Sequence, residues 1–264
     1  MAHIQCNFWS EVLGTVCDMT VLLPQRAPSH PELRRGKTLA RRSYPVLYLF
    51  HGLCGDYRTW LANTALEHLA QNSNLAIVMP SGGRGFFTDM AHGARYGAFF
   101  ADELPEIAAS MFPVRTKREE CFVAGASMGG YGALRLALSV PERFGAAFAM
   151  SPLVDLKRAI THGNSAISAE EMHDVFGDPE EQIARGNDLF DLAQKARTGD
   201  APPPRIAIYS GTEDLLYQDA LMLRRHLSDL DWPNLTCSLD APGKHDWSYW
   251  AAQIPAMLNF FRKP

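Results

Sequence analysis

A short glycine-rich segment contains the residue best suited to nucleophilic chemistry. It reads Gly125-Ala126-Ser127-Met128-Gly129, a G-x-S-x-G pattern between an apolar run and a stretch with helical spacing. In such a strand–turn–helix, the glycines prevent a clash between close backbone segments, and the turn lifts the serine hydroxyl clear of the sheet. We therefore predict that Ser127 is a nucleophile. The alternative is a glycine-rich turn without catalytic use.

A serine hydroxyl needs a neighbouring base to react at neutral pH. Of the nine histidines, His245 is the best candidate, because it lies just after the last predicted strand, on the loop to the final helix. His51 instead begins the loop after the apolar run Val46–Phe50, where we interpret it as a structural residue. The other histidines lie in the first strand, in loops or in helical patterns.

A carboxylate should orient the imidazole and stabilise its cation. Asp214 fits this role because it follows the predicted strand Arg205–Tyr209 at its carboxyl end. The order Ser127, Asp214, His245 along the chain is also the order found in α/β-hydrolases. The competing carboxylates are Glu213, Asp240 and Asp246.

The oxyanion that forms when a serine attacks a carbonyl needs backbone N–H donors. We expect one donor from Met128, the residue after the nucleophile, and one from Leu53 in the loop 51–55. Two glycines in this loop let its backbone turn toward the serine, and Gly52 and Cys54 are alternative donors. We interpret the Cys54 side chain as a buried, inert thiol; the alternative is an oxidation-sensitive thiol beside this loop.

Several further residues are candidates for contacts with a substrate. Aromatic side chains commonly line ligand pockets, and Asp89 and His92 are suited to hydrogen-bonding a polar leaving group. For the aromatic residues the alternative is core packing, and for the polar pair it is a capped loop. No cysteine or histidine cluster has zinc-ligand spacing, so we expect no metal and no other cofactor. The aromatic candidates are Trp60, Phe86, Phe87, Tyr96, Trp247 and Trp250.

These residues need a scaffold, and the hydrophobic pattern predicts an α/β fold. Short apolar runs predict strands, and the first two are close enough for an antiparallel hairpin around Gly14. Helical spacing fills the gaps, which favours a mostly parallel sheet of about eight strands with helices on both faces. The predicted strands are Ile4–Val12, Val16–Leu23, Val46–Phe50, Leu75–Met79, Cys121–Ala124, Ala146–Met150, Arg205–Tyr209 and Leu235–Leu239. The predicted helices are Trp60–Ala70, Ala98–Phe112 (kinked or started at Pro105), Met128–Val140, Gln218–Leu230 and Trp247–Phe261.

Two segments interrupt this alternation. Residues 152–204 hold acidic and small residues and end in Ala201-Pro202-Pro203-Pro204. We predict a helical insertion over the sheet edge, which acts either as a partial lid or as an insertion without a gating role. We interpret the basic cluster from Arg34 to Arg42 as a solvated loop between two strands.

Composition excludes several classes of protein. A length of 264 residues allows one or two globular domains, and we predict a single domain, 1–264, because one sheet must carry the residues between 51 and 245. A net charge of −4 argues against nucleic-acid binding. No apolar run approaches the roughly 18 residues of a membrane span. Five cysteines without a disulfide pattern or an export signal favour the cytoplasm.

Six segments of the chain, taken in order, are similar to those of one known family. They read HGLCGDYRTW, PSGGRGFFTDM, ELP, GASMGGYGALRLAL, GTEDLL and PGKHDWSYW. The chain resembles the putative-esterase family that contains esterase D, an S-formylglutathione hydrolase, and within it most resembles the bacterial tributyrin-esterase and acetylesterase branch. The resemblance is weakest at 152–204. It implies the triad Ser127, Asp214 and His245 and the oxyanion donors Leu53 and Met128. Many relatives carry a larger residue in place of Ala126.

The sequence therefore predicts a serine carboxylesterase that cleaves short-chain acyl esters, acetyl to butyryl, through an acyl-enzyme. Acetylated or feruloylated carbohydrates are further candidate substrates. One alternative is a thioesterase of the S-formylglutathione hydrolase type. The other is a non-catalytic binding module; such a protein should lack a triad member or an elbow glycine, and none is missing here. The expected partner is a small-molecule ester, not a nucleic acid or a membrane. The sequence also allows a homodimer through edge elements.

Overall fold

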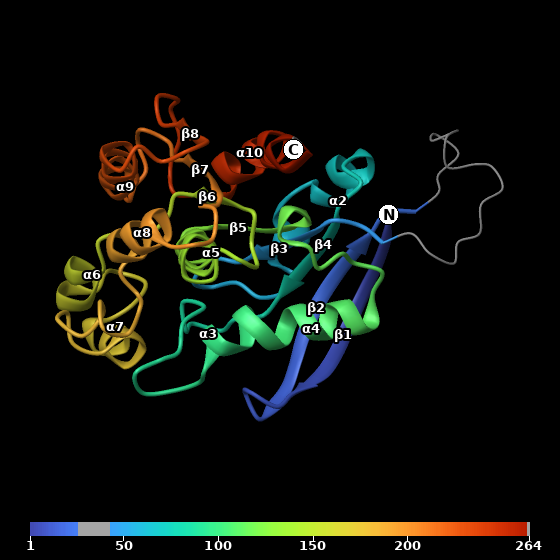
Figure 1. Cartoon of the computed structure of the whole chain (residues 1–264), viewed down its shortest axis with the longest axis horizontal. Coiled ribbons are helices and arrows are strands. Elements are labelled where there is room, and N and C mark those ends of the chain that lie inside the picture. Colours follow the sequence, from blue (N-terminus) through green and yellow to red (C-terminus); the bar gives the residue numbers. More distant parts are fainter. Residues whose placement is uncertain (26–42, 263–264) are drawn as a thin grey trace.

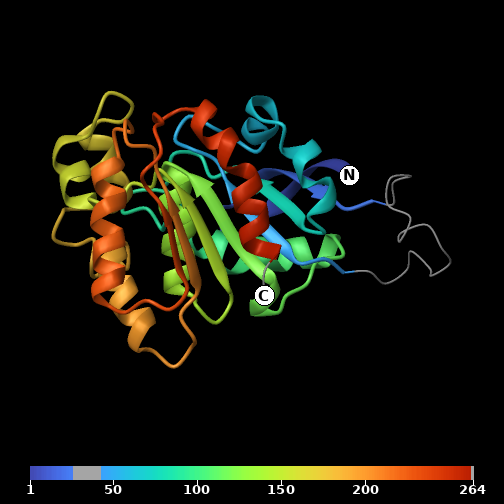
Figure 2. The ribbon, with the colours of Figure 1, turned by 90° about the horizontal axis from the view of Figure 1, so that it is seen from above.

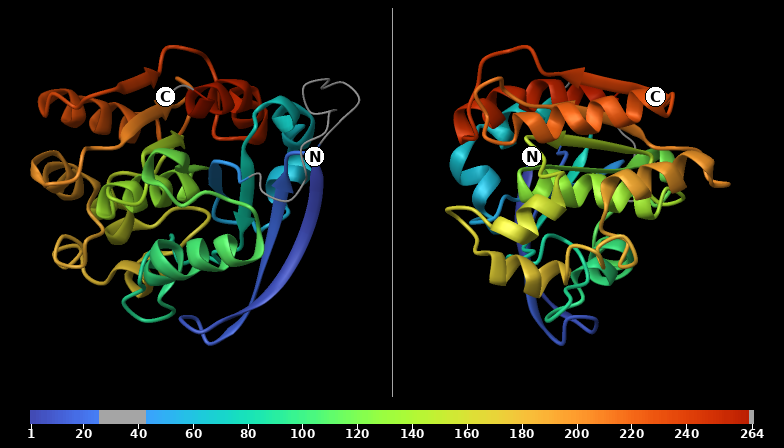
Figure 3. Two further views of the ribbon diagram at one scale, coloured as in Figure 1. Left: turned by 45° about the vertical axis from the view of Figure 1, so that its right-hand side comes forward. Right: turned by 90° about the vertical axis from the view of Figure 1, so that its left-hand side faces the viewer.

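An eight-stranded sheet forms the centre of the protein (Figure 1). The computed structural model describes residues 1–25 and 43–262, in which the strands lie in the order β1-β2-β4-β3-β5-β6-β7-β8. Strands β3 to β8 are parallel, whereas β1 and β2 form an antiparallel hairpin that joins the sheet at β4 and extends along one side of the molecule (Figure 3). The strands are β1 Ala2–Ser10, β2 Thr15–Leu23, β3 Val46–Phe50, β4 Ala76–Pro80, β5 Cys121–Ala126, β6 Ala146–Met150, β7 Arg205–Tyr209 and β8 Leu235–Ser238.

The central parallel strands are buried on both faces. In β3, Val46, Tyr48 and Phe50 face one hydrophobic core, and Leu47 and Leu49 face the other. Successive side chains of a strand point to opposite faces, so a strand covered on both sides reads as a continuous apolar run. This is why the hydrophobic pattern located the strands correctly.

Helices cover both faces of the sheet. Helices α1, α2 and α10 pack on one face, and α4, α5, α8 and α9 pack on the other. Figure 2 shows α9 and α10 on opposite sides of the strands. The predicted α/β architecture is therefore confirmed. The helices are α1 Thr59–Asn63, α2 Leu66–Leu69, α3 Tyr96–Ala98, α4 Leu104–Met111, α5 Met128–Ser139, α6 Leu156–His162, α7 Ala169–Phe176, α8 Leu189–Thr198, α9 Tyr217–Asp229 and α10 Trp247–Arg262.

Two predicted helices are interrupted in the structure. The segment 60–70 is divided into α1 and α2, because the backbone at Thr64 is extended and its hydroxyl donates to the carbonyl of Trp60. The segment 98–112 consists of a π-helix, Phe99–Glu103, followed by α4 with Pro105 in its first turn. A proline has no N–H to donate within a helix, so it is tolerated at the start of α4.

Three helices, α6, α7 and α8, occupy the segment between β6 and β7. Each begins with a side-chain cap, since Asp155, Ser168 and Asp188 each accept a hydrogen bond from the backbone N–H three residues later. Helix α8 packs against α5 and α9, while α6 and α7 pack on each other (Figure 1). The insertion therefore has ordered, individually capped helices.

Two further sequence predictions concern surfaces and membranes. Within residues 1–25 and 43–262, no helix combines the length and the apolar character that spanning a membrane requires. The basic cluster from Arg34 to Arg42 lies outside the described residues, so the solvated loop expected there stays a prediction.

Candidate active site

Ser127 lies at a sharp turn between β5 and α5. Its backbone angles, φ 59° and ψ −119°, are rare for a residue with a side chain. A Cβ on Gly125 would lie 2.4 Å from the carbonyl carbon of Gly129, and a Cβ on Gly129 would lie 2.6 Å from the carbonyl oxygen of Phe50. The close approach of β5, α5 and the end of β3 therefore requires both glycines of the motif.

Three side chains from distant parts of the sequence form a hydrogen-bonded series. His245 Nε2 lies 2.9 Å from Ser127 Oγ, and His245 Nδ1 lies 2.9 Å and 3.1 Å from the two carboxylate oxygens of Asp214. These residues follow β5, β7 and β8, whose carboxyl ends lie at the same edge of the sheet. Because a carboxylate only accepts, Nδ1–H donates to Asp214, and Nε2 accepts from the Ser127 hydroxyl.

Asp214 is buried and kept ionised by its neighbours. Its side chain is 0% exposed, whereas that of His245 is 17% exposed. Burial raises the pKa of Asp214, but the hydrogen bond and charge of His245 outweigh it, together with the nearby Ser151 hydroxyl and the hydrogen bond from the Leu216 N–H, and the pKa is lowered from its ordinary value. An imidazole oriented by an ionised carboxylate is therefore within hydrogen-bond reach of Ser127.

The competing carboxylates do not face the imidazole. Glu213 and Asp240 are exposed. Asp246 instead caps α10, because its Oδ1 accepts hydrogen bonds from the Ser248 hydroxyl at 2.5 Å and the Tyr249 N–H at 3.1 Å. Of these four acids, only Asp214 contacts the ring of His245.

His51 has the structural role expected from its place at the start of a loop. It is fully buried, its Nε2 accepts the Gly82 N–H at 2.9 Å, and its Nδ1–H donates to the Gly52 carbonyl at 2.7 Å. Burial lowers its pKa from the ordinary histidine value. With both ring nitrogens occupied, His51 joins the loop after β3 to the loop after β4 and has no nitrogen free to serve as a base.

A cavity of about 420 Å³ opens beside Ser127. Leu53 and Met128 both line it, and a Cβ on the neighbouring Gly52 would lie 3.7 Å from the Cβ of Ser127. Cys54 is exposed and lines the same cavity, so its interpretation as a buried thiol is wrong. The other residues that line the cavity include Phe86, Leu153, Ala159, Asn164, Ser165, Ile167, Met172, Leu215, Asp246, Trp247 and Trp250.

Among the predicted aromatic contacts, Trp247 lines the cavity, as do Phe86 and Trp250. The structure corrects the prediction for Trp60, which is fully buried behind the wall, donates its indole N–H to the Phe50 carbonyl at 2.9 Å and packs edge-on against Trp247. Phe87 and Tyr96 also lie outside the cavity. The Phe87 ring stacks on Phe50, and the Tyr96 ring lies where a Cβ on Gly85 would be.

The predicted polar contacts also lie elsewhere. Asp89 accepts the Ala98 N–H at 2.9 Å, which is the capped loop that was its alternative interpretation. His92 is exposed and lies beside His173 and Asp174 rather than at the cavity. Both predictions are therefore corrected, because neither side chain lines the cavity beside Ser127.

Ser151 and Trp250 form a supporting layer behind the triad that sequence reasoning did not identify. Ser151 is fully buried, has φ 47° and accepts the indole N–H of Trp250 at 3.0 Å, and its hydroxyl helps to lower the pKa of Asp214. The Trp250 ring meets His245 edge-on, with 5.0 Å between ring centroids. The available signal was position, since Ser151 directly follows β6 at the edge that carries Ser127.

The cavity wall formed by the insertion is fixed by Arg84, from the loop after β4. Its guanidinium pairs with both carboxylate oxygens of Glu171 on α7 and donates to the carbonyl of Ala166 at 2.9 Å. Ala166 and Ile167 line the cavity. Sequence reasoning did not identify this contact between the loop after β4 and α7, because no motif links Arg84 to Glu171.

Known proteins resemble this chain over nearly its full length. A model of the family described as "Putative esterase" matches residues 10–261. The acetyl esterase of Caldicellulosiruptor saccharolyticus is 30% identical, and the alignment covers 100% of this chain and 99% of that protein. The structure of substrate-bound fluorophosphonate-binding serine hydrolase F of Staphylococcus aureus is 28% identical, with a TM-score of 0.87 over 100% of this chain and 99% of the other. S-formylglutathione hydrolase of the same organism is 28% identical, with a TM-score of 0.85 over 99% of both chains.

The family match runs from the last residue of β1 to one residue before the end of α10. The similar structures show that the fold extends over the whole chain, including the segment 152–204 where the sequence resemblance is weakest. The family resemblance seen in the sequence is therefore confirmed. The chain belongs to the "Putative esterase" family and is a carboxylic ester hydrolase with the α/β-hydrolase fold.

Proposed function

We propose that this ester hydrolase uses Ser127 as its nucleophile and cleaves esters of short acyl groups, acetyl to butyryl. The observation that carries the proposal is the 2.9 Å contact between Ser127 Oγ and His245 Nε2, beside a largely apolar cavity. Asp214 supports the same role for His245, because its carboxylate fixes the tautomer that leaves Nε2 free to accept a proton.

In the proposed reaction, His245 takes the proton of Ser127 as Oγ attacks the ester carbonyl. The N–H groups of Leu53 and Met128 stabilise the oxyanion, helped by the N-terminus of α5. His245 then gives the proton to the leaving alcohol, and the acyl group stays on Ser127. Water, deprotonated by His245, attacks this acyl-enzyme and releases the carboxylic acid, and the proton returns to Ser127.

The cavity walls support a neutral substrate. Leu153, Ile167 and Met172 offer apolar contacts to an acyl or alkyl group, and Asn164 and Ser165 add polar groups suited to a sugar hydroxyl of an acetylated or feruloylated carbohydrate. Among the described residues, the cavity lining contains Asp246 but no lysine or arginine. A glutathione thioester carries carboxylates that such a lining does not neutralise.

Thioester hydrolysis is the second candidate function. The similarity to the S-formylglutathione hydrolase structure favours it, and the same three side chains are suited to that reaction. The charge of the cavity lining favours the neutral ester, so we expect a higher kcat/KM for esters than for S-formylglutathione.

We propose that the insertion 152–204 acts as a partial lid within a single domain spanning 1–264. Its residues Leu153, Ala159, Ile167 and Met172 form one wall of the cavity.

We place the enzyme in the cytoplasm on the basis of its five free cysteines. A homodimer through the sheet edge is supported by Trp9 and Val16, which pair across the β1–β2 hairpin and are 60% and 61% exposed. Sedimentation of the purified protein tests this proposal, and we expect the mass of a dimer.

Labelling with a fluorophosphonate probe tests the proposed nucleophile. We expect the wild-type protein to be labelled and the Ser127→Ala variant to remain unlabelled, with hydrolysis of p-nitrophenyl acetate reduced by about 10⁴-fold or more. The matched control is Ser139→Ala, an exposed serine on α5, which should label like the wild type. Labelling of Ser127→Ala would overturn the assignment, and an unreactive wild-type protein would indicate a binding module.

A substrate panel then tests the proposed acyl preference. It contains p-nitrophenyl esters of rising chain length, acetylated xylo-oligosaccharides, methyl ferulate and S-formylglutathione. We expect kcat/KM to peak between acetyl and butyryl. A higher value for S-formylglutathione than for every ester would replace the proposed function with thioester hydrolysis.

A further inference from the structure

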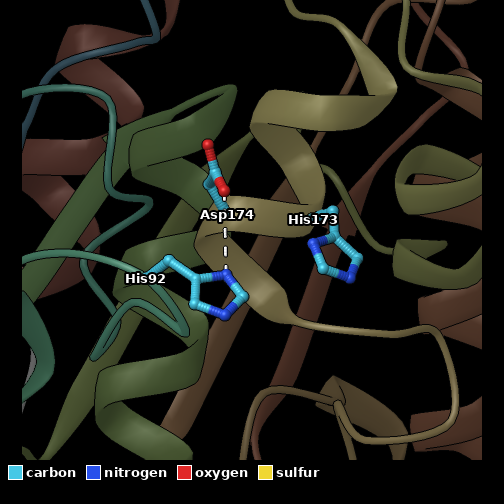
Figure 4. A group of neighbouring side chains, drawn as sticks. All are labelled: His92, His173 and Asp174. Carbon is cyan, nitrogen blue, oxygen red and sulfur yellow. Dashed lines mark ion pairs between the residues drawn. The ribbon is translucent and has the colours of Figure 1, made fainter.

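A cluster of metal-binding side chain types lies where the loop after β4 meets α7. His92 from this loop and His173 and Asp174 from α7 each offer a ligand atom, and these atoms lie within 4.8 Å of one another. Figure 4 shows His92 and Asp174 facing each other, with the His173 ring beside them. None of the three lines the cavity beside Ser127. We propose that they bind a divalent transition-metal ion, for which Zn²⁺ is the probe.

The spacing fits a shared cation better than a direct contact. His92 Nδ1 and Asp174 Oδ1 are 3.7 Å apart, which is too long for a good hydrogen bond. Two ligand atoms that each lie about 2.0–2.1 Å from a tetrahedral zinc ion are about 3.3–3.4 Å apart. A small rotation of either side chain closes that difference. The imidazole rings of His92 and His173 are neighbours, with 5.6 Å between their centroids and an angle of 22° between their planes.

Asp178 gives His173 the partner that a metal-bound histidine usually has. His173 Nε2 lies 3.1 Å from Asp178 Oδ1. Because the carboxylate only accepts, Nε2 carries the proton and Nδ1 keeps its lone pair. In Figure 4 the other ring nitrogen of His173 is turned toward His92 and Asp174. Such a carboxylate–histidine pair orients the ring and makes the ligand nitrogen a stronger donor.

Backbone contacts hold the two segments together without help from an ion. The His92 N–H donates to the Asp174 carbonyl at 2.8 Å, and the Ala91 N–H donates to the Val175 carbonyl at 2.9 Å. The side chains of His92, Asp174 and His173 are 63%, 53% and 45% exposed, which leaves room for a water ligand. Two imidazole nitrogens and one carboxylate oxygen suit zinc and its neighbours nickel and copper.

An ion at this site would join the loop after β4 to the lid-like helix α7. Helix α7 also carries Met172, which lines the cavity, and Phe176, whose ring packs edge-on against Phe86 of the same cavity with 5.2 Å between ring centroids. The ion therefore adds a second link to the one between Arg84 and Glu171. We expect its binding to stabilise the folded protein, since only the folded chain brings the ligands together.

Calorimetric titration of untagged, chelator-treated protein with ZnCl₂ tests the site. We expect one saturable Zn²⁺ per chain and a higher melting temperature with zinc. His92→Ala and His173→Ala should each weaken binding by at least about 10-fold and reduce the thermal shift, and Asp178→Asn should weaken it by about 10-fold. The matched control is His162→Ala, an exposed histidine of α6 in the same insertion, which should bind like the wild type.

The result is independent of the proposed catalytic function. Circular dichroism and melting without zinc show whether the variants fold, which we expect because both histidine side chains are about half exposed or more. Absence of saturable zinc binding by the wild-type protein would overturn the proposal. So would equal affinity of the wild type and the two histidine variants, which would place the zinc elsewhere, for example at His245.

Discussion

Trp250 donates its indole N–H to the hydroxyl oxygen of Ser151 across 3.0 Å of the buried interior. The Ser151 hydroxyl in turn helps to lower the pKa of Asp214, and the ring of Trp250 meets His245 edge-on. The acid and the base of the proposed triad are therefore both positioned by one pair of residues, from the end of β6 and from α10. The pair is 99 residues apart in the sequence.

Removing the Ser151 hydroxyl should impair the proposed reaction without removing a reacting group. For Ser151→Ala we expect kcat to fall by about 10-fold with little change in KM, because Asp214 loses a polar neighbour that lowers its pKa and the Trp250 N–H loses its acceptor. Trp250→Phe keeps an aromatic ring near His245 and should have a smaller effect. Steady-state kinetics on p-nitrophenyl acetate measure both, and wild-type kcat in Ser151→Ala would contradict the positioning role.

Asp214 should be the acid whose charge matters for His245. We expect Asp214→Asn to lower kcat by about 10³–10⁴-fold, since an amide can hold the imidazole in the wrong tautomer and does not stabilise its cation. The matched changes Asp240→Asn, on an exposed residue, and Asp246→Asn, on the cap of α10, should cost far less. Ester hydrolysis by the three variants measures this, and the reverse ranking would overturn the assignment.

The stability of the fold should depend on Asp214 ionisation in acid. Its pKa is lowered in the folded protein, so the unfolded chain binds this proton more readily. The stabilisation is therefore complete above the unfolded pKa of about 3.9 and is lost as the pH falls through the lower folded pKa. Urea unfolding from pH 5 to pH 3 should show the excess stability of wild type over Asp214→Asn shrinking. An excess that grows toward pH 3 would contradict the sign of the shift.

The elbow should not tolerate a methyl group at Gly125. The new Cβ would lie 2.4 Å from the backbone of Gly129, so we expect Gly125→Ala to lower the free energy of unfolding by about 3 kcal/mol. The control is Gly14→Ala in the β1–β2 turn, where a Cβ would meet no atom within 4 Å. Only the positive φ of 64° disfavours alanine there, so we expect a loss of about 1 kcal/mol in the free energy of unfolding. Urea denaturation compares the two, and equal losses would show that crowding at the elbow is unimportant.

The sequence by itself determined which segments form the central strands and which candidate residues follow these strands. The parallel strands are buried on both faces, so Val46–Phe50 and its neighbours read as apolar runs, and loop residues directly after them had to lie at one edge. Gly125 and Gly129 marked the turn because their crowding is local. The sequence alone therefore points to Ser127, Asp214 and His245, and their catalytic use stays a proposal.

Only the tertiary structure decided which side chains meet across elements. Trp60 and Tyr96 have the residue types of pocket walls, yet Trp60 packs behind Trp247 and Tyr96 packs on a glycine loop. The Ser151–Trp250 bond and the His92–Asp174 pair join segments that no local pattern connects. The physical reason is that hydrophobic periodicity records whether a residue is buried, whereas the partner of a buried or polar group depends on how the helices and loops pack against one another.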